Sequence, residues 1–540
     1  MTLETPETVD LQATAALPEA LVAPALLPRP ELAGRRILVV GLGESGLAMA
    51  RWASFGKAQV TVVDTREHPP QRQTLTEQCP QVRFVGGPLE PDLIERLMQE
   101  GMDLVAWSQG LSPTQGPAAR FHEALRAQGV EIWGELDFFA LEIARLRQAG
   151  HACTVLAITG TNGKTTTTQL VAHLCQSAGL STCAAGNISP AALSALQDAL
   201  LADALPRVWV LELASFQLAL CSRFEADASV ILNLTEDHLD WHDNMAAYRE
   251  AKQKIHAGRS LCIVNRDDPA SRPDRITLEL PASAAAPARR KAAPAPLRPM
   301  VSFGLDSPTQ APGFGVQSDG GLDWLVEAVE EEMHGRRTAG AQPAIRLRRL
   351  MPADALRLRG AHNRANVLAA LALAQAAGAP MAAMLRALGS FEAGAHRCTL
   401  IARIDEVDYI DDSKGTNVGA TVAALVGSPN PVVLIAGGDG KGQDFAPLVP
   451  AVSSRATAVL LIGRDAPRLQ KALEPAAVAL ESCDSLESAV RRAAELARPG
   501  QSVLLSPACA SLDMFRNYVH RAEVFISSVH DLARERGQPC

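Results

Sequence analysis

Residues 156–170 read LAITGTNGKTTTTQL, a stretch that joins an apolar run, a glycine-containing turn and a threonine-rich segment. This order predicts a strand, a turn and a helix, which is typical of a loop that binds nucleotide phosphates. The common form of that loop, G-x-x-x-x-G-K-[ST], needs a glycine at position 158, where Ile158 stands. The glycine comes two residues later, as Gly160. The stretch is therefore a damaged loop, a coincidence or a distinct nucleotide site.

The residue types of this loop indicate what it could bind. Backbone N–H groups and the positive end of the following helix would face an anion. Lys164 would reach the outer phosphates, and a hydroxyl group of Thr165 or Thr166 would help to hold Mg²⁺. The alternative is a strand-to-helix turn with a solvated lysine. The apolar run before the turn and the threonine run after it favour the phosphate loop.

Outward from this loop, apolar runs alternate with helical stretches from Arg36 to the end of the chain. Such alternation predicts βαβ units and parallel sheets. Three sets of strands begin near residues 36, 153 and 407, so we expect an α/β fold with three α/β domains in series. These are a Rossmann-like N-terminal domain, a P-loop-type ATPase central domain and a Rossmann-like C-terminal domain. The expected bounds are 1–30 for a disordered leader, 31–140, 141–393 with a flexible insertion near 270–350, and 394–540.

Composition narrows the class of protein. The chain has 540 residues, 47% hydrophobic and 20% charged, which is the mix of a soluble globular protein. Its net charge of −8 argues against a nucleic-acid partner. The ten cysteines form no C-x-x-C pair, which argues against a zinc ribbon or a disulfide framework and favours a reducing compartment.

The same composition bears on location. No run of 18 apolar residues occurs, so no membrane span is expected. Residues 1–28 contain no basic residue, unlike the start of a signal peptide. Residues 281–300 are rich in Ala, Pro and Arg and cannot build a core, so they are interpreted as a surface insertion. We expect a cytoplasmic protein that binds neither membrane nor nucleic acid.

A second glycine-rich turn lies in the first domain. Gly41, Gly43 and Gly46 form G-x-G-x-x-G between a predicted strand and a predicted helix, and Asp64 ends the next strand. This is the setting in which a diphosphate binds at a helix N-terminus. The pattern alone fits a dinucleotide, the diphosphate of a UDP-sugar, or a purely structural turn.

Two later strand ends offer oxygen and nitrogen ligands for a metal ion. Glu212 follows the apolar run RVWVL, where an acid is costly unless it meets a cation or a donor. His238 lies just beyond another strand, in NLTEDHLDWH. A strand-end acid bonded to a loop and a non-ligating histidine are the alternatives. His238 and His242 are four residues apart, but Leu239 stands where a zinc protease needs glutamate, which excludes that class.

A set of motifs along the chain resembles the Mur ligases, ATP-dependent enzymes that form amide bonds in peptidoglycan synthesis. The motifs occur in this order: GTNGKTTT, GN at 186–187, LELASFQL, NLTEDHLD, YREAKQKI, GAHNRANVLAA, HR at 396–397, DDSKGTNVGAT, GGDGKGQDF and SPACASLDMF. The resemblance covers nearly everything from Arg36 onward. In this family, G-T-N-G-K-T replaces the longer phosphate loop, so nothing is missing from residues 156–170.

Particular residues select a branch of the family. The branch that adds L-alanine typically has histidine where Asn162 stands, and the branch that adds a diamino acid carries a D-N-P-R segment that is absent here. DDSKGTNVGAT and SPACASLDMF look like the branch that joins D-glutamate to UDP-N-acetylmuramoyl-L-alanine. Tyr518 stands where relatives often have phenylalanine.

The resemblance implies roles for residues of the ATP site. Asn363 and Asn366 are three apart on a predicted helix and share a face, although without the resemblance they could equally cap that helix. Arg397 comes from the third domain, so domain closure would assemble the site. The implied ATP-binding residues are Gly160, Thr161, Asn162, Gly163, Lys164, Thr165, Thr166, Asn363, Asn366, Arg397, Asp412 and Lys414.

The resemblance also implies two Mg²⁺ ions. Their ligands would be Thr165, Glu212, His238 and Lys252, the last after carbamylation. From the residues alone, Lys252 would be interpreted as a solvated charge on a helix. The implied catalytic residues are Lys164, Glu212, His238 and Lys252.

For the substrates, the first-domain turn would bind the UDP group, and third-domain residues would bind the carboxylates of D-glutamate, for which lysine and hydroxyl groups are suited. The implied substrate-binding residues are Gly43, Asp64, Thr65, Arg66, Asn187, His238, Thr416, Lys441, Ser511 and Tyr518. Cys509 is interpreted as a packing residue, because the mechanism needs no thiol nucleophile.

The implied reaction converts a carboxylate into an acyl phosphate with ATP, after which the amine of D-glutamate displaces phosphate. Electrostatic stabilisation of the transferring phosphoryl group would supply most of the catalysis. The enzyme would be a monomer in cytoplasmic precursor synthesis for the cell wall, and thereby serve cell shape and division. The alternatives are another Mur-type or folylpolyglutamate-type ligase and, resting on residues 41–64 alone, an NAD-dependent oxidoreductase.

Overall fold

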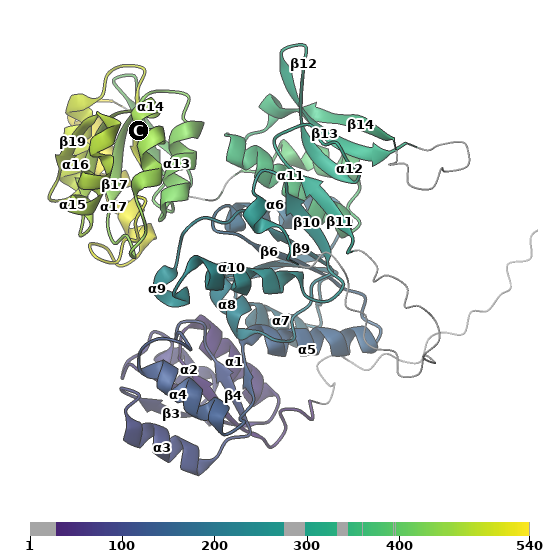
Figure 1. Ribbon diagram of the computed structural model, residues 1–540. Helices are drawn as coiled ribbons and strands as arrows, with labels where there is room; N and C mark the ends of the chain where they lie inside the picture. Colours follow the sequence, from purple (N-terminus) through teal and green to yellow (C-terminus); the bar gives the residue numbers. More distant parts are fainter. Residues whose placement is uncertain are drawn as a thin grey trace, which may run out of the picture.

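The computed structural model describes residues 29–274, 298–331, 344–358, 360–392, 394 and 396–538. The expected leader falls almost wholly outside these residues, and so does most of the 281–300 segment. The chain forms three sheets that follow one another in sequence, which confirms the predicted α/β class with three sets of strands. Figure 1 shows that each of the three regions contains a sheet flanked by helices.

The first region is a five-stranded parallel sheet in the order β3-β2-β1-β4-β5. The strand at its centre, β1, is apolar and buried from its second residue onward, as expected for a strand covered on both faces. Its strands are β1 (Arg36–Val40), β2 (Gln59–Asp64), β3 (Arg83–Gly86), β4 (Leu104–Trp107) and β5 (Ile132–Trp133). Its helices are α1 (Glu44–Phe55), α2 (Arg72–Gln78), α3 (Pro91–Glu100) and α4 (Gly116–Ala127).

The central region is a nine-stranded sheet in the order β14-β13-β12-β11-β10-β9-β6-β8-β7. Its strands are β6 (Thr154–Thr159), β7 (Thr182–Gly186), β8 (Val208–Glu212), β9 (Ala228–Ile231), β10 (Leu261–Asn265), β11 (Met300–Phe303), β12 (Gly313–Asp319), β13 (Leu322–Glu330) and β14 (Ile345–Pro352). Its helices are α5 (Glu135–Gln148), α6 (Lys164–Ser177), α7 (Ala192–Leu201), α8 (Ser215–Leu220), α9 (Leu239–His242), α10 (Met245–Gln253), α11 (Ala361–Ala376) and α12 (Met381–Leu388). Short 3₁₀ turns are η2 (Lys254–His256), η3 (Pro269–Ser271) and η4 (Ala353–Ala355).

Strands β11 to β14 occupy the described parts of the 270–350 stretch, where composition predicts a flexible insertion. Strand β12 pairs parallel with β11, and the β12–β13–β14 meander then extends the sheet in antiparallel pairing. The sequence prediction therefore differs from the structure here. Strand β14 reads IRLRRLMP, and its three exposed residues are arginines, so it lacks the continuous apolar run of the buried strands.

The third region is a six-stranded sheet in the order β15-β16-β20-β17-β18-β19, in which only the β15–β16 pair is antiparallel. Its strands are β15 (Thr399–Ile404), β16 (Val407–Asp411), β17 (Val432–Gly437), β18 (Ala456–Ile462), β19 (Ala479–Ser482) and β20 (Ser502–Leu505). Its helices are α13 (Val418–Gly427), α14 (Val449–Arg455), α15 (Ala466–Leu473), α16 (Leu486–Leu496) and α17 (Tyr518–Glu535), with 3₁₀ turns η5 (Ala446–Leu448) and η6 (Glu474–Ala476).

The apolar cores show how the regions are joined. One core combines residues of the first sheet with helices α1, α5 and α7, and it continues to β8, where Trp209 meets Phe139 edge to face. The two cores of the third sheet contain no residue before 401 among the described residues. The first and central regions thus share a core, whereas the third region packs on its own.

None of the described helices is long and apolar enough to cross a bilayer.

Candidate active site

The phosphate loop predicted from the sequence lies between β6 and α6, in the middle of the parallel part of the central sheet. Gly163 has φ of +83°, and a Cβ atom there would lie 2.6 Å from Oδ1 of Asn366 on α11. Only glycine fits, both for its backbone conformation and for this close approach. The loop and α11 are therefore held together, which brings two predicted ATP-site segments side by side.

Lys164 is the first residue of α6 and folds back over its own loop. Its Nζ donates to the carbonyl oxygens of Gly160 and Thr161, both at 2.8 Å. Burial lowers the pKa of Lys164, while the nearby carboxylates of Glu212 and Asp237 oppose that shift. The ammonium group thus lies at the loop beside buried negative charge.

Glu212 ends β8, the neighbour of β6, and only 2% of it is exposed. Its Oε1 accepts a hydrogen bond of 3.1 Å from Nδ2 of Asn187. Its Oε2 is buried and has no hydrogen-bond partner among the described residues. A buried carboxylate oxygen without a partner is costly, so a cation is the partner that this site fits. Among the described residues, no three His, Cys, Asp or Glu side chains form a metal-binding cluster, and this is compatible with Mg²⁺, which keeps several waters and is bound by few protein ligands.

Lys252, on α10, is only 1% exposed, so it is not a solvated helix charge. Its Nζ donates to Oγ1 of Thr159 at 3.1 Å and to the carbonyl oxygen of Gly160 at 2.9 Å. Burial, together with the positive charge of Lys164, holds its pKa well below the usual value. A buried lysine with a lowered pKa spends more time as a neutral amine, which is nucleophilic.

His238 precedes α9 in a left-handed conformation, with φ of +56°. Its Nε2 lies 3.6 Å from Oδ2 of Asp237, and its ring packs edge-on against Phe216. Burial lowers the pKa of His238 far below its ordinary value, although Asp237 opposes the shift. The imidazole is therefore neutral near pH 7, as a metal ligand must be.

A cavity of about 440 Å³ adjoins the loop and is built by both the central and third regions. Eight predicted ATP-site residues line it: Asn162, Gly163, Thr166, Asn363, Asn366, Arg397, Asp412 and Lys414. Apolar groups such as Leu232, Phe303 and Leu305 line it as well, so the cavity offers both apolar and charged groups. This combination suits a nucleotide.

Third-region residues reach the phosphate loop directly. The Nζ of Lys414 donates to Oγ1 of Thr165 at 3.3 Å, and burial lowers its pKa to about 8. Asp412, which lines the same cavity, accepts from Oγ of Ser506 at 2.7 Å, and burial raises its pKa to about 7. Arg397 lies close enough to Glu212 and Asp412 to feel both charges.

The residues predicted to bind D-glutamate follow strands of the third sheet. Lys441 lies 3.6 Å from Oδ1 of Asp237, and the ring of Tyr518 lies 5.3 Å from Nζ of Lys414. Thr416 is half-buried and Ser511 is buried. The structure thus brings Lys441 and Tyr518 towards the phosphate loop.

In the first region, the glycine-rich turn leads from β1 into α1. A Cβ atom at Gly46 would lie 1.9 Å from the carbonyl oxygen of Gly41, so the helix crosses the strand at glycine distance. A Cβ atom at Gly43 would meet nothing within 4 Å, so space is open above the turn. Asp64 accepts from the backbone N–H of Leu42 at 2.6 Å, which ties the end of β2 to the turn.

Asp64 is also bound by the residue two positions on. Arg66 donates to it from its backbone and from Nε and Nη2, at 2.8 to 2.9 Å. Burial acts to raise the pKa of Asp64, but these hydrogen bonds outweigh it and hold the pKa below its usual value. Thr65, between them, is half-buried.

Four residues that sequence patterns did not single out take part in this site. Asp237 is buried between His238 and Lys441, and Asn417 bonds to Asn162 of the loop. Asn233 holds the backbone of Asn162, and the hydroxyl of Tyr248 lies 3.1 Å from Oγ1 of Thr161. Only Asp237 carried a sequence signal, an acid beside the candidate ligand His238. The other three act through contacts between distant segments.

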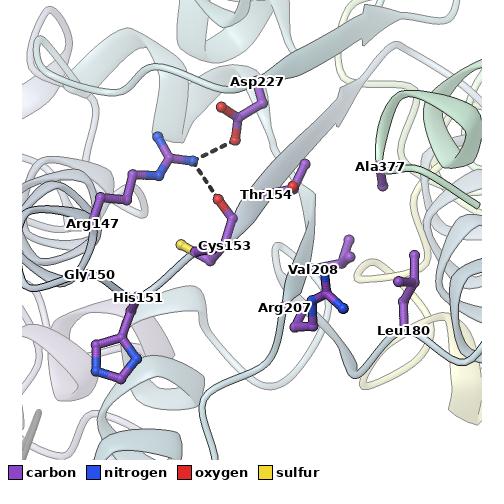
Figure 2. Close-up of a pocket in the computed structure, with 11 residues that line it drawn as sticks. Arg147, Gly150, His151, Cys153, Thr154, Leu180, Arg207, Val208, Asp227 and Ala377 are labelled. Carbon is purple, nitrogen blue, oxygen red and sulfur yellow. Dashed lines mark hydrogen bonds and ion pairs between the residues drawn. The ribbon is translucent and has the colours of Figure 1, made fainter. Parts of the chain in front are cut away.

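A second cavity, of about 450 Å³, contains none of the predicted site residues. It lies at the amino ends of β6 and β8, at the opposite end of these strands from the phosphate loop (Figure 2). The guanidinium of Arg147 donates there to Asp227 and to the carbonyl oxygen of Cys153, and Asp227 also accepts from the backbone N–H of Val155. These contacts fasten α5 to the sheet, so we attribute them to packing.

Three models of known protein domains match the chain, one in each of its three regions. The model of the MurD-like N-terminal domain of Mur ligases matches residues 35–134. The model of the Mur ligase middle domain matches residues 158–282, and the model of the Mur ligase glutamate ligase domain matches residues 396–509. The chain is 50% identical over 510 residues to the UDP-N-acetylmuramoylalanine–D-glutamate ligase of Burkholderia mallei, covering 93% of this chain and 98% of that one. It is also 50% identical over 509 residues to the enzyme of the same name from Burkholderia cenocepacia, with the same coverage.

Solved structures share the fold at lower identity. The UDP-N-acetylmuramate–alanine ligase of Thermotoga maritima aligns with a TM-score of 0.51 at 18% identity, covering 92% of this chain and 99% of that one. The MurF ligase of the same organism, in complex with ADP, aligns with a TM-score of 0.52 at 16% identity, covering 93% and 97%. These similarities support the three-region α/β architecture.

Proposed function

The chain belongs to the Mur ligase family, and on that premise we propose that it joins D-glutamate to UDP-N-acetylmuramoyl-L-alanine at the expense of ATP. The product would be a peptidoglycan precursor. The curated relatives from two Burkholderia species, which the chain matches at 50% identity over 98% of their length, carry the names of enzymes for this reaction.

The observation that carries this function is the buried carboxylate oxygen of Glu212 beside a phosphate loop. Around one loop and one cavity lie the carboxylate of Glu212, whose Oε2 has no partner among the described residues, and the cations of Lys164, Arg397 and Lys414. Such an arrangement suits a triphosphate with its metal ions. An oxidoreductase that used only the first-region turn would leave this site without a purpose.

In the first step of the proposed reaction, a carboxylate oxygen of the muramoyl-alanine substrate attacks the γ-phosphorus of ATP. The bond from that phosphorus to the β,γ-bridging oxygen breaks, and ADP leaves. Lys164 and Lys414 would hold the phosphate oxygens on which negative charge gathers, and Arg397 would approach from the third region. These cations supply charge stabilisation, which is the larger part of phosphoryl-transfer catalysis.

In the second step, the amine of D-glutamate attacks the acyl carbon after its ammonium group has lost a proton. The tetrahedral intermediate then expels inorganic phosphate, and an amide bond remains. Thr416, Lys441, Ser511 and Tyr518 would bind the carboxylates of D-glutamate. Gly43, Asp64, Thr65 and Arg66 would bind the UDP end of the other substrate, with Asn187 and His238 near its reacting end.

We further propose that two Mg²⁺ ions are used, which would screen the charges of the phosphates. Thr165, Glu212 and His238 would be ligands. The neutral amine of Lys252 would add to CO₂ and lose a proton, and the resulting carbamate would provide an anionic ligand. The burial and lowered pKa of Lys252 support this modification, because only an unprotonated amine reacts with CO₂.

We also propose that the enzyme is a cytoplasmic monomer whose domains span residues 31–140, 141–393 and 394–540.

The function is tested by measuring phosphate release from ATP with Mg²⁺ and UDP-N-acetylmuramoyl-L-alanine, with each amino acid added in turn. Release that requires both this substrate and D-glutamate is the expected result. Release with another amino acid alone, or reduction of NAD(P)⁺ without ATP use, would overturn the proposal.

A further inference from the structure

The side chains of Asn162 and Asn417 form a reciprocal pair across the boundary between the central and third regions. Nδ2 of Asn162 donates to Oδ1 of Asn417 at 3.2 Å, and Nδ2 of Asn417 donates to Oδ1 of Asn162 at 3.0 Å. Nδ2 of Asn417 also donates to Oδ2 of Asp237 at 3.2 Å. We refer to Asn162, Asn417 and Asp237 as the interdomain clasp.

Each end of the clasp is anchored in its own region. Asn417 caps α13, since its Oδ1 accepts from the backbone N–H of Ala420 at 2.9 Å. Asn162 is held from behind by Asn233, whose Oδ1 accepts from the backbone N–H of Asn162 at 2.8 Å and whose Nδ2 donates to its carbonyl oxygen at 3.1 Å. The backbone of Asn162 and the side chain of Asn417 are thus each fixed within their own region, and neither side chain can turn away without losing the bonds of the pair.

The fit at the clasp is close. A Cβ atom at Gly419, in the first turn of α13, would lie 3.0 Å from Nδ2 of Asn162 and 3.0 Å from Oγ1 of Thr235. Any larger side chain would press against the loop. The first turn of α13 therefore lies against the phosphate loop with no room for a larger side chain.

The clasp also joins two binding segments. Asn162 lies between Gly160 and Gly163 of the phosphate loop, and Asn417 directly follows Thr416, a proposed contact of D-glutamate. Two residues before Thr416, Lys414 donates to Thr165 on the other side of the loop. A change in the position of the third region is thus transmitted to the loop through amide groups.

We propose that Asn162, Asn417 and Asp237 are positioning residues that couple the phosphate loop to the amino-acid-binding region, so that the loop is fixed for phosphoryl transfer only when the third region is closed. The inference rests on the proposed function. It assigns to the side chain of Asn162 a role in sensing closure, in addition to any contact with ATP.

The test is a double-mutant cycle with Asn162→Ala and Asn417→Ser, because serine keeps the cap of α13 and loses the amide. We expect each single variant to raise the KM for D-glutamate about tenfold, with a smaller change in kcat, since each loses the two hydrogen bonds of the pair. The double variant should be about as impaired as either single one. For Asn417→Ser, which lies outside the ATP cavity, the affinity for ATP without D-glutamate and the thermal midpoint should stay unchanged.

Gly419→Ala provides a second, independent variant. Alanine favours helix over glycine, so the thermal midpoint should not fall, yet the KM for D-glutamate should rise because the closed arrangement is obstructed. Small-angle X-ray scattering with a non-hydrolysable ATP analogue should show a larger radius of gyration for this variant and for Asn417→Ser than for the wild type. The control is Asn430→Ser, whose amide donates to Ser502 within the third region and which should behave as the wild type.

Effects that multiply to about a hundredfold in the double variant, or an unchanged KM with unchanged scattering, would overturn the clasp. The wild-type assay separates this result from the proposed function. A wild-type protein that releases phosphate without D-glutamate contradicts the function itself, whereas the scattering comparison still tests closure.

Discussion

At the scale of single residues, two lysines contact the same loop from different helices. Lys164 bonds to the carbonyl oxygens of the loop and Lys252 approaches the same loop from α10. Replacing Lys164 by alanine removes the cation that would contact phosphate. We expect kcat to fall by at least about a hundredfold, comparable to the loss of one electrostatic donor in an active site. A phosphate-release assay checks this, and full activity would show that the loop does not bind ATP as proposed.

Lys252→Ala should be nearly inactive, because the proposed carbamate ligand is lost. Short-chain carboxylic acids such as acetate should restore part of the activity by placing a carboxylate in the vacated space. Titrating acetate against the phosphate-release rate measures this. Acetate should leave Lys164→Ala inactive, which makes that variant the matched control. Wild-type rates in Lys252→Ala would exclude a role for this side chain in metal binding.

The burial of His256 predicts how the free energy of unfolding depends on pH, and this prediction is independent of catalysis. Burial lowers its pKa to about 3, and the charge of Arg298 adds to the shift. The ring is anchored by a bond of 2.9 Å between Nδ1 and Oγ of Ser229. The unfolded chain, with a histidine pKa near 6.5, takes up a proton more readily than the folded protein, so stability is lost as pH falls from about 6.5 towards 3.

Between pH 7.5 and pH 5, this histidine should remove about 2 kcal/mol from the free energy of unfolding of the region that contains it. His256→Asn, which keeps a group near Nδ1, should flatten that loss relative to the wild type. Urea unfolding at the two pH values measures the difference. Equal pH slopes for the two proteins would mean that His256 is not the group responsible.

At the scale of elements, the crossing of α1 over β1 depends on one missing side chain. Gly46→Ala would place a Cβ atom 1.9 Å from the carbonyl oxygen of Gly41, so the helix must shift. We expect a loss of about 3 kcal/mol or more in the free energy of unfolding. Gly43→Ala is the matched control for stability, because its Cβ atom would meet nothing within 4 Å. It should fold normally and weaken binding of the UDP substrate, which calorimetry can measure.

Local patterns predicted the parallel sheets well, because buried parallel strands such as β1 and β6 are continuous apolar runs. They also located Gly160 to Lys164 and the strand-end acid Glu212. The meander β12 to β14 was not predicted, because the three exposed residues of β14 are all arginines and the strand lacks the continuous apolar run of a buried strand. The burial of Lys252 could not be predicted from its helix, since it results from the approach of α10 to the loop.

At the scale of the whole molecule, the separate cores predict two unfolding events. The first and central regions share a core, and the third region has its own cores. Differential scanning calorimetry without ligands should show two transitions. Phe525→Ala, in a core of the third region, should shift one transition to lower temperature, with a loss of about 3 to 5 kcal/mol in the free energy of unfolding of that region. Phe139→Ala, in the shared core, should shift the other transition by a similar loss. A single transition shifted equally by both variants would contradict this division.

The relation between the regions was the least predictable part from sequence. Asn417 lies 180 residues from Asp237 and 255 from Asn162 in the sequence, and it contacts both only in the folded molecule. Arg397 was expected to reach the ATP site from the third region, and it lines the shared cavity with Asn363. Motifs identify groups that need particular chemistry, whereas contacts between amides leave no spacing rule in a single sequence.

The two cores of the third region contain only residues of that region among the described residues, and this has a practical consequence. A domain that is stabilised by its own core can be exchanged for another domain. The replacement must keep the polar contacts of the interdomain clasp and a glycine at the position of Gly419. We therefore expect that the amino-acid specificity can be changed by replacing the third region, while the phosphate loop and the rest of the central region are kept.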